Sequence, residues 1–242
     1  KPRNPQPPLL PEANPVGVYR RDFEVPAGWD GRDIYLHIAG AKSGLYVYVN
    51  GKEVGYSEDS KNPAEFLINK DLKPGKNVLS LKIFRWSTGS YLECQDFWRV
   101  SGIERDVYLW SQPKTAIQDF RVISTLDDTY KTGIFKLAID LKNHEEKAKN
   151  LTISYELLDK SGKAIATESK NLWVSPAVNS TASFETSIPD VATWTAEIPN
   201  LHKMVMTIKD GDKTVEVVPY HVGFRRFEMK QTKELAGNGK PY

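Results

Sequence analysis

The feature that most limits how this 242-residue chain can fold is its alternation of apolar and polar residues with a period of two. Leu151, Ile153, Tyr155 and Leu157 fall on one side of an extended segment, and helical periodicity is nearly absent from the whole sequence. Successive side chains of a strand point to opposite faces, so segments of this kind are typical of half-buried strands. The sequence therefore predicts an all-β protein.

The first half of the chain carries several such segments, separated by turn residues. Ile34, Leu36 and Ile38 share one face of an expected strand. Asn50-Gly51 is the strongest hairpin signal in the chain, because a type I′ turn requires positive φ at both central residues. The expected strands cover residues 16–25, 33–39, 45–49, 54–56, 78–84 and 106–110.

Pro113 marks the expected boundary, since aromatic residues become rarer and the alternation steadier after it. Phe135, Leu137, Ile139 and Leu141 line one face of a strand there, with Lys136, Asp140 and Lys142 expected on the outer face. About seven strands fit between residues 117 and 228, which favours an immunoglobulin-like sandwich without the paired cysteines. We expect domains at residues 1–113 and 114–229, and the start of a third at residues 230–242.

Composition excludes several classes of protein. Hydrophobic residues make up 40% and charged residues 26%, as in soluble globular proteins, and the net charge is only +2. Scattered charges of both signs argue against nucleic-acid binding, and no apolar run is long enough to span a membrane. We expect a soluble protein, cytoplasmic or periplasmic. The Pro-rich start fits an interior piece of a longer chain or a mature N-terminus, and the end, where a new strand begins at Tyr242, suggests a truncated chain.

The stretch from Arg85 to Val107 is unusually rich in aromatic and charged side chains. Aromatic faces can cover the C–H side of a sugar ring while carboxylates and guanidiniums bind its hydroxyls. Alternatively, these residues form a buried network of charged side chains that holds a long loop against a β-sandwich, which would explain the same composition. The residues in question are Arg85, Trp86, Tyr91, Glu93, Asp96, Phe97, Trp98 and Arg99.

Residue types alone leave the chemistry of this stretch open. The four histidines lie too far apart in sequence to suggest a zinc site, and Cys94 has no evident base beside it. Glu93 and Asp96 could form a glycosidase pair, but retaining enzymes usually hold such carboxyls about 5–5.5 Å apart on separate elements. Asp96 fits better as an acceptor for sugar hydroxyls or as a ligand of a hard cation.

The whole stretch has a specific pattern: Arg85-Trp-Ser-x-Gly-Ser-Tyr-Leu-Glu-x-Gln-Asp-x-Trp-Arg-x-Ser-Gly-Ile-x-Arg-Asp-Val. It resembles the N-terminal sugar-binding domain of family 2 glycoside hydrolases, in particular the β-galactosidases; the β-glucuronidases and β-mannosidases are less similar here. Further matching segments are Asn14-Pro-x-Gly-x-Tyr, Val49-Asn-Gly-x-x-Val-Gly-Tyr-Ser-x-Asp-Ser, Pro63-Ala-Glu-Phe, Trp194-Thr-Ala-Glu-Ile-Pro-Asn-Leu, Val222-Gly-Phe-Arg and Asn238-Gly-Lys-Pro.

The resemblance implies a jelly-roll sandwich, then an immunoglobulin-like sandwich, then a catalytic (β/α)₈ barrel that carries both catalytic glutamates. This fragment would then hold no catalytic residue. The parent enzyme would remove terminal β-D-galactose with retention, through a covalent galactosyl-enzyme intermediate.

The resemblance also assigns roles to single residues. Asp96 matches the first-domain aspartate that touches galactose and a Na⁺ ion shared with the barrel, and Mg²⁺ is a further ion expected in the parent. Lys42 stands where the family has a sugar-contacting asparagine, and Cys94 where it often has an acid, so both depart from the pattern. Arg85, Trp86, Glu93, Trp98 and Arg99 would support the loop.

Three hypotheses therefore stand for the fragment itself. In the first, the first domain of the fragment helps to shape the galactose site of the parent's own barrel. In the second, the fragment is a carbohydrate-binding module that uses exposed aromatics such as Trp29 or Tyr46. In the third, the first domain helps to build a homo-oligomer interface.

Overall fold

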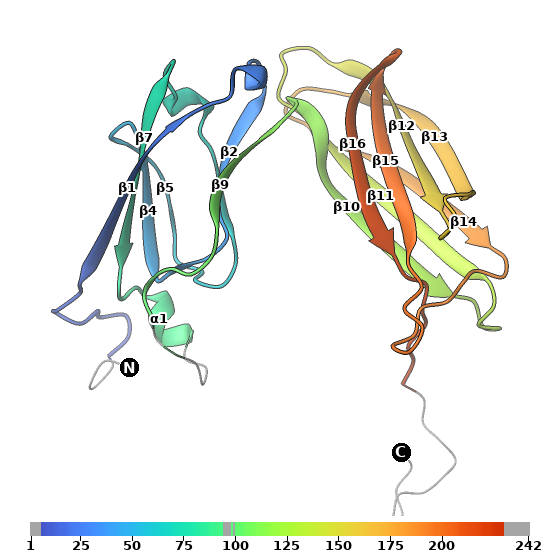
Figure 1. Cartoon of the computed structure of the whole chain (residues 1–242), viewed down its shortest axis with the longest axis horizontal. Helices are drawn as coiled ribbons and strands as arrows, with labels where there is room; N and C mark the ends of the chain where they lie inside the picture. The colour runs from blue at the N-terminus through green and yellow to red at the C-terminus, as the bar shows by residue number, and fades with distance from the viewer. Residues whose placement is uncertain (1–5, 94–97, 99, 230–242) are drawn as a thin grey trace, which may run out of the picture. The chain divides into compact units, whose positions relative to one another are not determined.

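The alternating segments form antiparallel strands in a computed structural model, which describes residues 6–93, 98 and 100–229 (Figure 1). The chain divides into two compact units, Lys1–Pro113 and Lys114–Tyr242. Each unit has its own hydrophobic core, and no buried residue belongs to both. The all-β fold class predicted from the alternation is confirmed. None of the described helices is long and apolar enough to cross a membrane.

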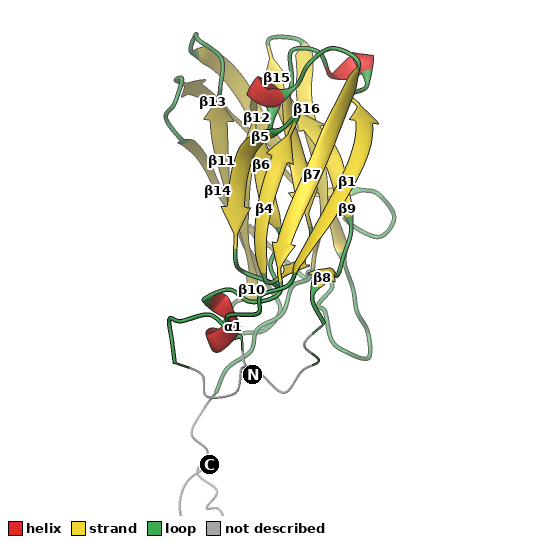
Figure 2. Ribbon diagram, turned by 90° about the vertical axis from the view of Figure 1, so that its left-hand side faces the viewer, coloured by secondary structure: helices red, strands yellow, loops and turns green. Residues whose placement is uncertain are grey.

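The first unit is a sandwich of two main sheets and a two-stranded ribbon. The sheets have the orders β1-β7-β4-β5 and β6-β2-β9, and β3 pairs with β8. Figure 2 shows β4, β7 and β1 side by side. Short helical turns lie between strands. The elements are β1 (Val16–Glu24), η1 (Ala27–Trp29), β2 (Asp33–Ile38), β3 (Ala41–Lys42), β4 (Gly44–Val49), β5 (Lys52–Ser57), β6 (Ala64–Leu67), η2 (Asn69–Asp71), β7 (Lys76–Phe84), α1 (Gly89–Leu92), β8 (Gly102–Ile103) and β9 (Val107–Gln112).

The first core lies between the two main sheets. Ile34, Leu36 and Ile38 are buried, as their alternation predicts, together with Leu45 and Val47 from β4. The core is not closed on every side. A cavity of about 470 Å³ opens between β1 and β9, although the core side chains that reach it stay almost fully buried. It is lined by Tyr19, Arg20, Arg21, Phe23, Leu36, Val49, Ile68, Leu79, Leu81, Ile103, Val107, Tyr108 and Leu109.

The Asn50-Gly51 hairpin forms as predicted. Both residues have positive φ, 51° and 82°, and they join β4 to β5. The Asn50 side chain adds contacts that the turn signal does not reveal: its amide donates to the carbonyl oxygen of Asp71 at 2.8 Å and its oxygen accepts from the Val78 amide at 3.1 Å. One residue thus sets the turn and fastens it to the neighbouring loop.

The second unit is a seven-stranded sandwich within the described residues. Its sheets have the orders β10-β11-β14 and β13-β12-β15-β16. In a constant-type immunoglobulin domain the fourth strand joins the sheet of the first, whereas here β13 pairs with β12 in the other sheet. The strands are β10 (Thr115–Leu126), β11 (Gly133–Asn143), β12 (Lys149–Leu158), β13 (Ala164–Val174), β14 (Ser180–Ile188), β15 (His202–Asp210) and β16 (Lys213–Val222).

The alternation is correct along most of β11 and wrong at its end. Phe135, Leu137, Ile139 and Leu141 are buried as predicted. Lys142, expected on the outer face, is only 5% exposed. From Leu141 onward β11 is covered on both faces, where the chain enters a hydrogen-bonded turn, and a lysine can bury its long aliphatic stem in such a place.

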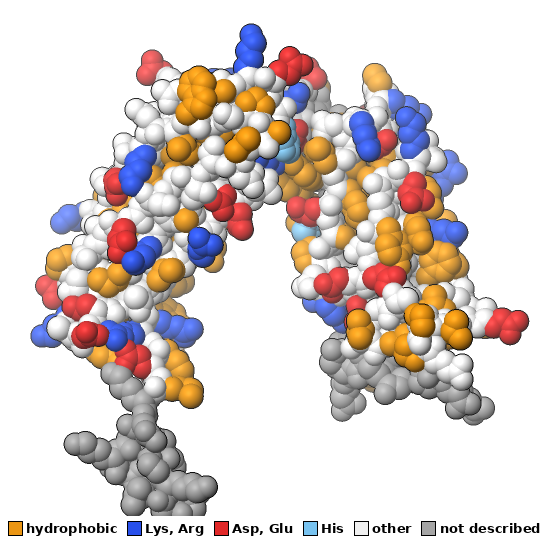
Figure 3. All heavy atoms as spheres, turned by 180° about the vertical axis from the view of Figure 1, so that it is seen from behind, with side chains coloured by type: hydrophobic (Ala, Val, Ile, Leu, Met, Phe, Trp, Pro, Cys, Tyr) orange, Lys and Arg blue, Asp and Glu red, His pale blue; other side chains and the backbone are white. Residues whose placement is uncertain are grey.

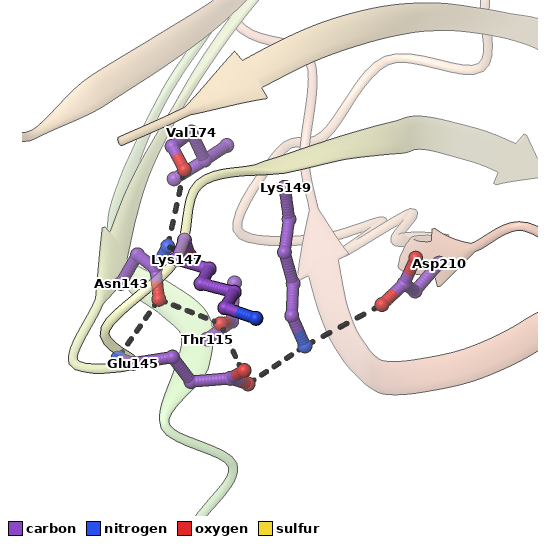
Figure 4. A network of polar contacts seen from close by, with 7 residues as sticks. All are labelled: Thr115, Asn143, Glu145, Lys147, Lys149, Val174 and Asp210. Carbon is purple, nitrogen blue, oxygen red and sulfur yellow. Dashed lines mark hydrogen bonds and ion pairs between the residues drawn. The ribbon is translucent and has the colours of Figure 1, made fainter. Parts of the chain in front are cut away.

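That turn is organised by Asn143 (Figure 4). Its side-chain amide donates to the carbonyl oxygens of Lys147 at 2.9 Å and Val174 at 3.1 Å. Its side-chain oxygen accepts from the Thr115 hydroxyl at 3.0 Å and the Glu145 amide at 2.9 Å. Four partners from β10, β13 and the turn itself satisfy one buried amide, so the end of this sandwich is held by polar contacts as well as by its apolar core.

Candidate functional site

The candidate site lies at the end of the first unit where β7 enters the loop that carries α1 (Figure 1). A small cavity of about 10 Å³ there, roughly the room one water molecule needs, is lined by residues from both ends of the aromatic loop and by Lys42, which lies more than 40 residues before the loop. It is lined by Lys42, Arg85, Trp86, Ser90, Glu93 and Ser101. Four predicted site residues, Lys42, Arg85, Trp86 and Glu93, are therefore neighbours.

Strand pairing places Lys42 at this rim. The two-residue strand β3 pairs with β8, so Lys42 lies opposite Gly102. Two further backbone bonds, from the Glu104 amide to the carbonyl oxygen of Gly40 and from the Ala39 amide to that of Asp106, continue the contact beyond Ala41. Both ends of the aromatic loop are thus anchored, one at β7 and the other beside Lys42.

Glu93 connects the loop to the turn after β5. Its Oε1 accepts a hydrogen bond from the Ser60 amide at 2.9 Å. Its Oε2 is buried and has no hydrogen-bond partner in the part of the chain that the structure describes. A buried carboxylate oxygen without a donor is costly, so it is a natural acceptor for a water or a ligand hydroxyl.

The turn α1 is held by a residue that the sequence did not single out. Glu58 accepts hydrogen bonds from the Thr88 hydroxyl at 2.6 Å and the Gly89 amide at 2.8 Å, and the Tyr56 hydroxyl also donates to it. Burial raises the pKa of Glu58, but these hydrogen bonds outweigh burial and leave the pKa below its usual value. The family motif leaves position 58 unspecified, so no signal in the sequence marked this residue.

The segment before β1 is tied to the same loop. Asn14 exchanges two hydrogen bonds with the backbone of Trp86, each 2.9 Å long, and the Arg85 amide donates to the carbonyl oxygen of Pro15 at 2.9 Å. The Tyr91 hydroxyl donates to the carbonyl oxygen of Leu9. The Pro-rich segment therefore fixes the first turn of the loop from outside.

The other predicted residues have different surroundings. Trp98 is 81% exposed, so within this chain its indole lies on the surface, and the scaffold role we expected for it stays a prediction. Asp96, Arg99 and Cys94 lie outside the described residues. The Arg85 guanidinium lies over the Trp86 ring, 5.4 Å from its centroid.

The described residues contain no group of three or more His, Cys, Asp or Glu side chains that could hold a metal ion. Glu93 offers one free carboxylate oxygen, which is far from a full set of oxygen ligands for a hard cation. An ion at this rim would need most of its ligands from outside these residues.

Comparison with known families decides the identity of both units. Residues 2–113 match the sugar-binding domain of glycosyl hydrolases family 2, and residues 115–225 match a second model described as glycosyl hydrolases family 2. The chain belongs to glycosyl hydrolase family 2. The resemblance inferred from the aromatic loop is confirmed.

Family 2 relatives extend well beyond this chain. The β-galactosidase of Priestia megaterium is 40% identical over 228 residues, which are 93% of this chain and 22% of that protein. The β-galactosidase of Streptococcus thermophilus is 40% identical over 241 residues, or 97% of this chain and 22% of that one. The chain thus spans less than a quarter of these relatives and is homologous to their β-galactosidase sequence.

Solved structures show the same fold at lower identity. Bacteroides uniformis β-glucuronidase 2 matches with a TM-score of 0.83 and 22% identity, over 94% of this chain and 28% of that one. A putative β-galactosidase from Bacteroides fragilis gives 0.80 and 22%, over 94% and 35%. At these identities the likeness concerns the fold alone.

Proposed function

We propose that this chain is the non-catalytic N-terminal part of a retaining β-galactosidase, and that the aromatic loop of its first unit helps to shape the galactose site of a catalytic barrel in the parent protein. The observation that carries the proposal is the 40% identity to β-galactosidases across nearly the whole chain. The parent would hydrolyse terminal β-D-galactosides through two barrel glutamates and a covalent intermediate.

The geometry of the loop supports a role at a sugar site. Lys42, Arg85 and Glu93 meet at one rim, so donors and an unsatisfied acceptor lie within one small area. Bonds between Asn14 and the Trp86 backbone and between Glu93 and the Ser60 amide hold the rim in place before any ligand binds. A preorganised polar rim of this kind is what recognition of sugar hydroxyls requires.

Individual roles follow the family motif. We propose Asp96 as the carboxylate that contacts galactose and contributes to a Na⁺ site completed by the parent's barrel, with Mg²⁺ as a further ion of the parent. Lys42 stands in the place of the family's asparagine, so its ammonium group would donate to a sugar hydroxyl where an amide otherwise does. Oligomer formation by the parent belongs to the same proposal.

The test uses the parent enzyme with its barrel. Hydrolysis of aryl β-D-galactoside and aryl β-D-glucuronide is compared for the wild type, for Asp96→Ala, and for Asp22→Ala as the control. Asp22 is an exposed aspartate on β1 that pairs with Lys76 of β7. We expect galactoside to be the better substrate, and Asp96→Ala to lower kcat/KM about a hundredfold, or about 2.7 kcal/mol of transition-state binding, while Asp22→Ala changes little.

Two results would count against the proposal. Unchanged galactoside turnover in Asp96→Ala would mean that the loop only supports the fold. A preference for glucuronide would place the parent in another branch of family 2.

A further inference from the structure

A second aromatic cluster lies on the outer face of the three-stranded sheet β6-β2-β9. Ile34, Leu36 and Ile38 of β2 enter the core, so Tyr35 and His37 between them face outward. The register of β9 places Trp110 opposite Tyr35 and Tyr108 opposite His37. We call these four side chains the aromatic face; they share no residue with the rim around Glu93.

The rings form two ordered cross-strand pairs. The Tyr35 and Trp110 rings stack with centroids 4.7 Å apart and planes 17° apart. The His37 and Tyr108 rings stack at 4.5 Å and 18°. The two pairs are two residues apart along both strands, roughly 6.6 Å, and thus form successive steps along the sheet. Stacked pairs restrict ring motion, so the platform is rigid before anything binds.

A carboxylate from the third strand joins the two pairs. Glu65 on β6 accepts a hydrogen bond from the Trp110 indole at 3.0 Å, and the same oxygen, Oε1, lies 2.6 Å from Nδ1 of His37. The side chain is 42% exposed, so the carboxylate remains accessible to solvent. The aromatic face therefore presents a fixed, solvent-accessible acceptor beside its rings.

Exposed apolar side chains alone would not mark a site. Hydrophobic residues reach the surface of both units, scattered among charged ones (Figure 3), which is normal for soluble proteins. The aromatic face differs because its rings are paired, aligned along the strands and hydrogen-bonded through one carboxylate. Tyr108, at 47% exposure, offers its ring to solvent at one end.

The chemistry of the aromatic face selects its ligand. A polyanion would meet the negative charge of Glu65, and the flanking cation Arg32 is already bonded to Ser111 at 2.8 and 3.1 Å. An apolar protein surface would have to bury the Glu65 carboxylate, which is costly. A neutral sugar chain avoids both problems, because its C–H faces cover aromatic rings and its hydroxyls donate to a carboxylate.

We infer that the aromatic face, built from Tyr35, His37, Tyr108 and Trp110 around Glu65, binds a chain of neutral pyranose sugars. Two successive ring pairs suit two or more adjacent sugar units better than a single one. This binding needs only the first unit, so it goes beyond the proposed role at a barrel site and can hold or fail independently of it.

The experiment is affinity electrophoresis of the 242-residue chain in gels that contain β-1,4-galactan, a neutral mixed-linkage β-glucan or, as the anionic comparison, polygalacturonate. The variants are Tyr108→Ala, Trp110→Ala and Tyr108→Phe, with Trp173→Ala on β13 as the matched control because that tryptophan is also exposed. Near-ultraviolet circular dichroism checks that each variant is folded. Tyr108→Ala is the deciding variant, since its side chain is the most exposed of the four.

We expect at least one neutral polysaccharide to retard the wild type, and Tyr108→Ala to weaken that association at least tenfold. Tyr108→Phe and Trp173→Ala should bind as the wild type does, and polygalacturonate should not retard the chain. Three results would overturn the inference: no retardation by either neutral polymer, equal retardation of the wild type and Tyr108→Ala, or equal retardation by the anionic polymer. The first would leave the aromatic face as a contact surface for another protein segment.

Discussion

At the scale of single residues, Glu58 is the side chain that holds α1 in place. Replacing it by Gln keeps one acceptor but removes the charge that strengthens three hydrogen bonds. We expect Glu58→Gln to destabilise the first unit by about 1 kcal/mol at pH 7. Amide hydrogen exchange of residues 88–93, measured by mass spectrometry, should speed up in this variant.

The pH dependence of this effect has a definite sign. The folded-state pKa of Glu58 is depressed, so its stabilisation is present above the unfolded-state pKa, about 4.3, and is lost as the pH falls through the folded-state value. Glu53→Gln is the control, since Glu53 bonds only to the exposed Tyr48 hydroxyl at 3.2 Å. Equal exchange in both variants at pH 7 would contradict a capping role for Glu58.

His202 is a second residue whose charge state matters. It is 3% exposed and its Nδ1 has no hydrogen-bond partner among the described residues. Burial lowers its pKa more than the Val222 backbone hydrogen bond and Asp159 raise it, and Lys160 acts in the same direction as burial. The fold therefore favours the neutral ring.

A base whose pKa is lower in the folded state binds its proton first in the unfolded state as the pH falls. This proton uptake favours the unfolded state and so destabilises the fold. The stability that His202 contributes should be complete above pH 6.5 and fall below it, by at most about 1.4 kcal/mol per pH unit. The free energy of unfolding, measured with denaturant between pH 7.5 and 5.5, should change less steeply with pH for His202→Gln than for the wild type. His221→Gln, at an exposed position on β16, should keep the wild-type slope; the same slope in all three proteins would refute the assignment.

At the scale of elements, the β4–β5 hairpin depends on two residues in left-handed backbone conformations. Gly51→Ala should cost about 1 kcal/mol, because an L-residue is strained there. Asn50→Ala should cost about 2 kcal/mol, since it adds the loss of the bonds to Asp71 and Val78. Denaturant unfolding followed through the tryptophans of the first unit measures both.

The control for this hairpin is Gly28→Ala, at a glycine without positive φ and with open space around its Cβ position. It should be neutral. If Asn50→Ala cost no more than Gly51→Ala, the side-chain bonds to the neighbouring loop would contribute nothing measurable.

The sequence predicted an element well when the contacts that define it join residues close together in the sequence, and poorly when they join residues far apart. Alternation identified the core of β2 and β11, because burial of one face is a local property of a strand. It failed at Lys142, where a turn covers both faces. It could not find α1, a single turn of four residues whose cap, Glu58, lies 30 residues away in sequence from Thr88.

The same reason limited the prediction of the site. The motif identified Arg85, Trp86 and Glu93 as members of one loop, and the family resemblance assigned Lys42 to the same sugar site. The pairing of β3 with β8, which brings Lys42 beside them, could not be predicted. Two-residue strands carry no periodic signal. The aromatic face was hidden for a related reason, since Tyr35 and Trp110 become neighbours only through the register of β2 and β9.

At the scale of the whole molecule, the two units differ in the size of their buried cores. In the second unit the largest core side chains, Phe135, Tyr155 and Phe224, are at most 1% exposed and contact one another. In the first unit, core residues such as Leu36 and Leu81 line the open cavity between β1 and β9. Burial of apolar surface is the main source of stability, and the described residues give the second unit twenty buried core residues against ten in the first, so the second unit should be the more stable.

Fragments of residues 6–113 and 114–229 should therefore behave differently when made separately. We expect residues 114–229 to unfold in one cooperative calorimetric transition at the higher temperature, because their buried core is the larger. They should bind little 1-anilinonaphthalene-8-sulfonate, because their own cavity of about 500 Å³ is lined mainly by charged and polar side chains. Residues 6–113 should unfold at a lower temperature and bind the dye, since about 470 Å³ of cavity is accessible from the side. Replacing Leu81, which lines that cavity, by Phe should fill part of the cavity and so reduce dye binding. The same replacement at Leu157, which is fully buried in the other fragment, should destabilise that fragment through overpacking. A first unit that matched the second in melting temperature and dye binding would mean that the cavity between β1 and β9 is closed in solution.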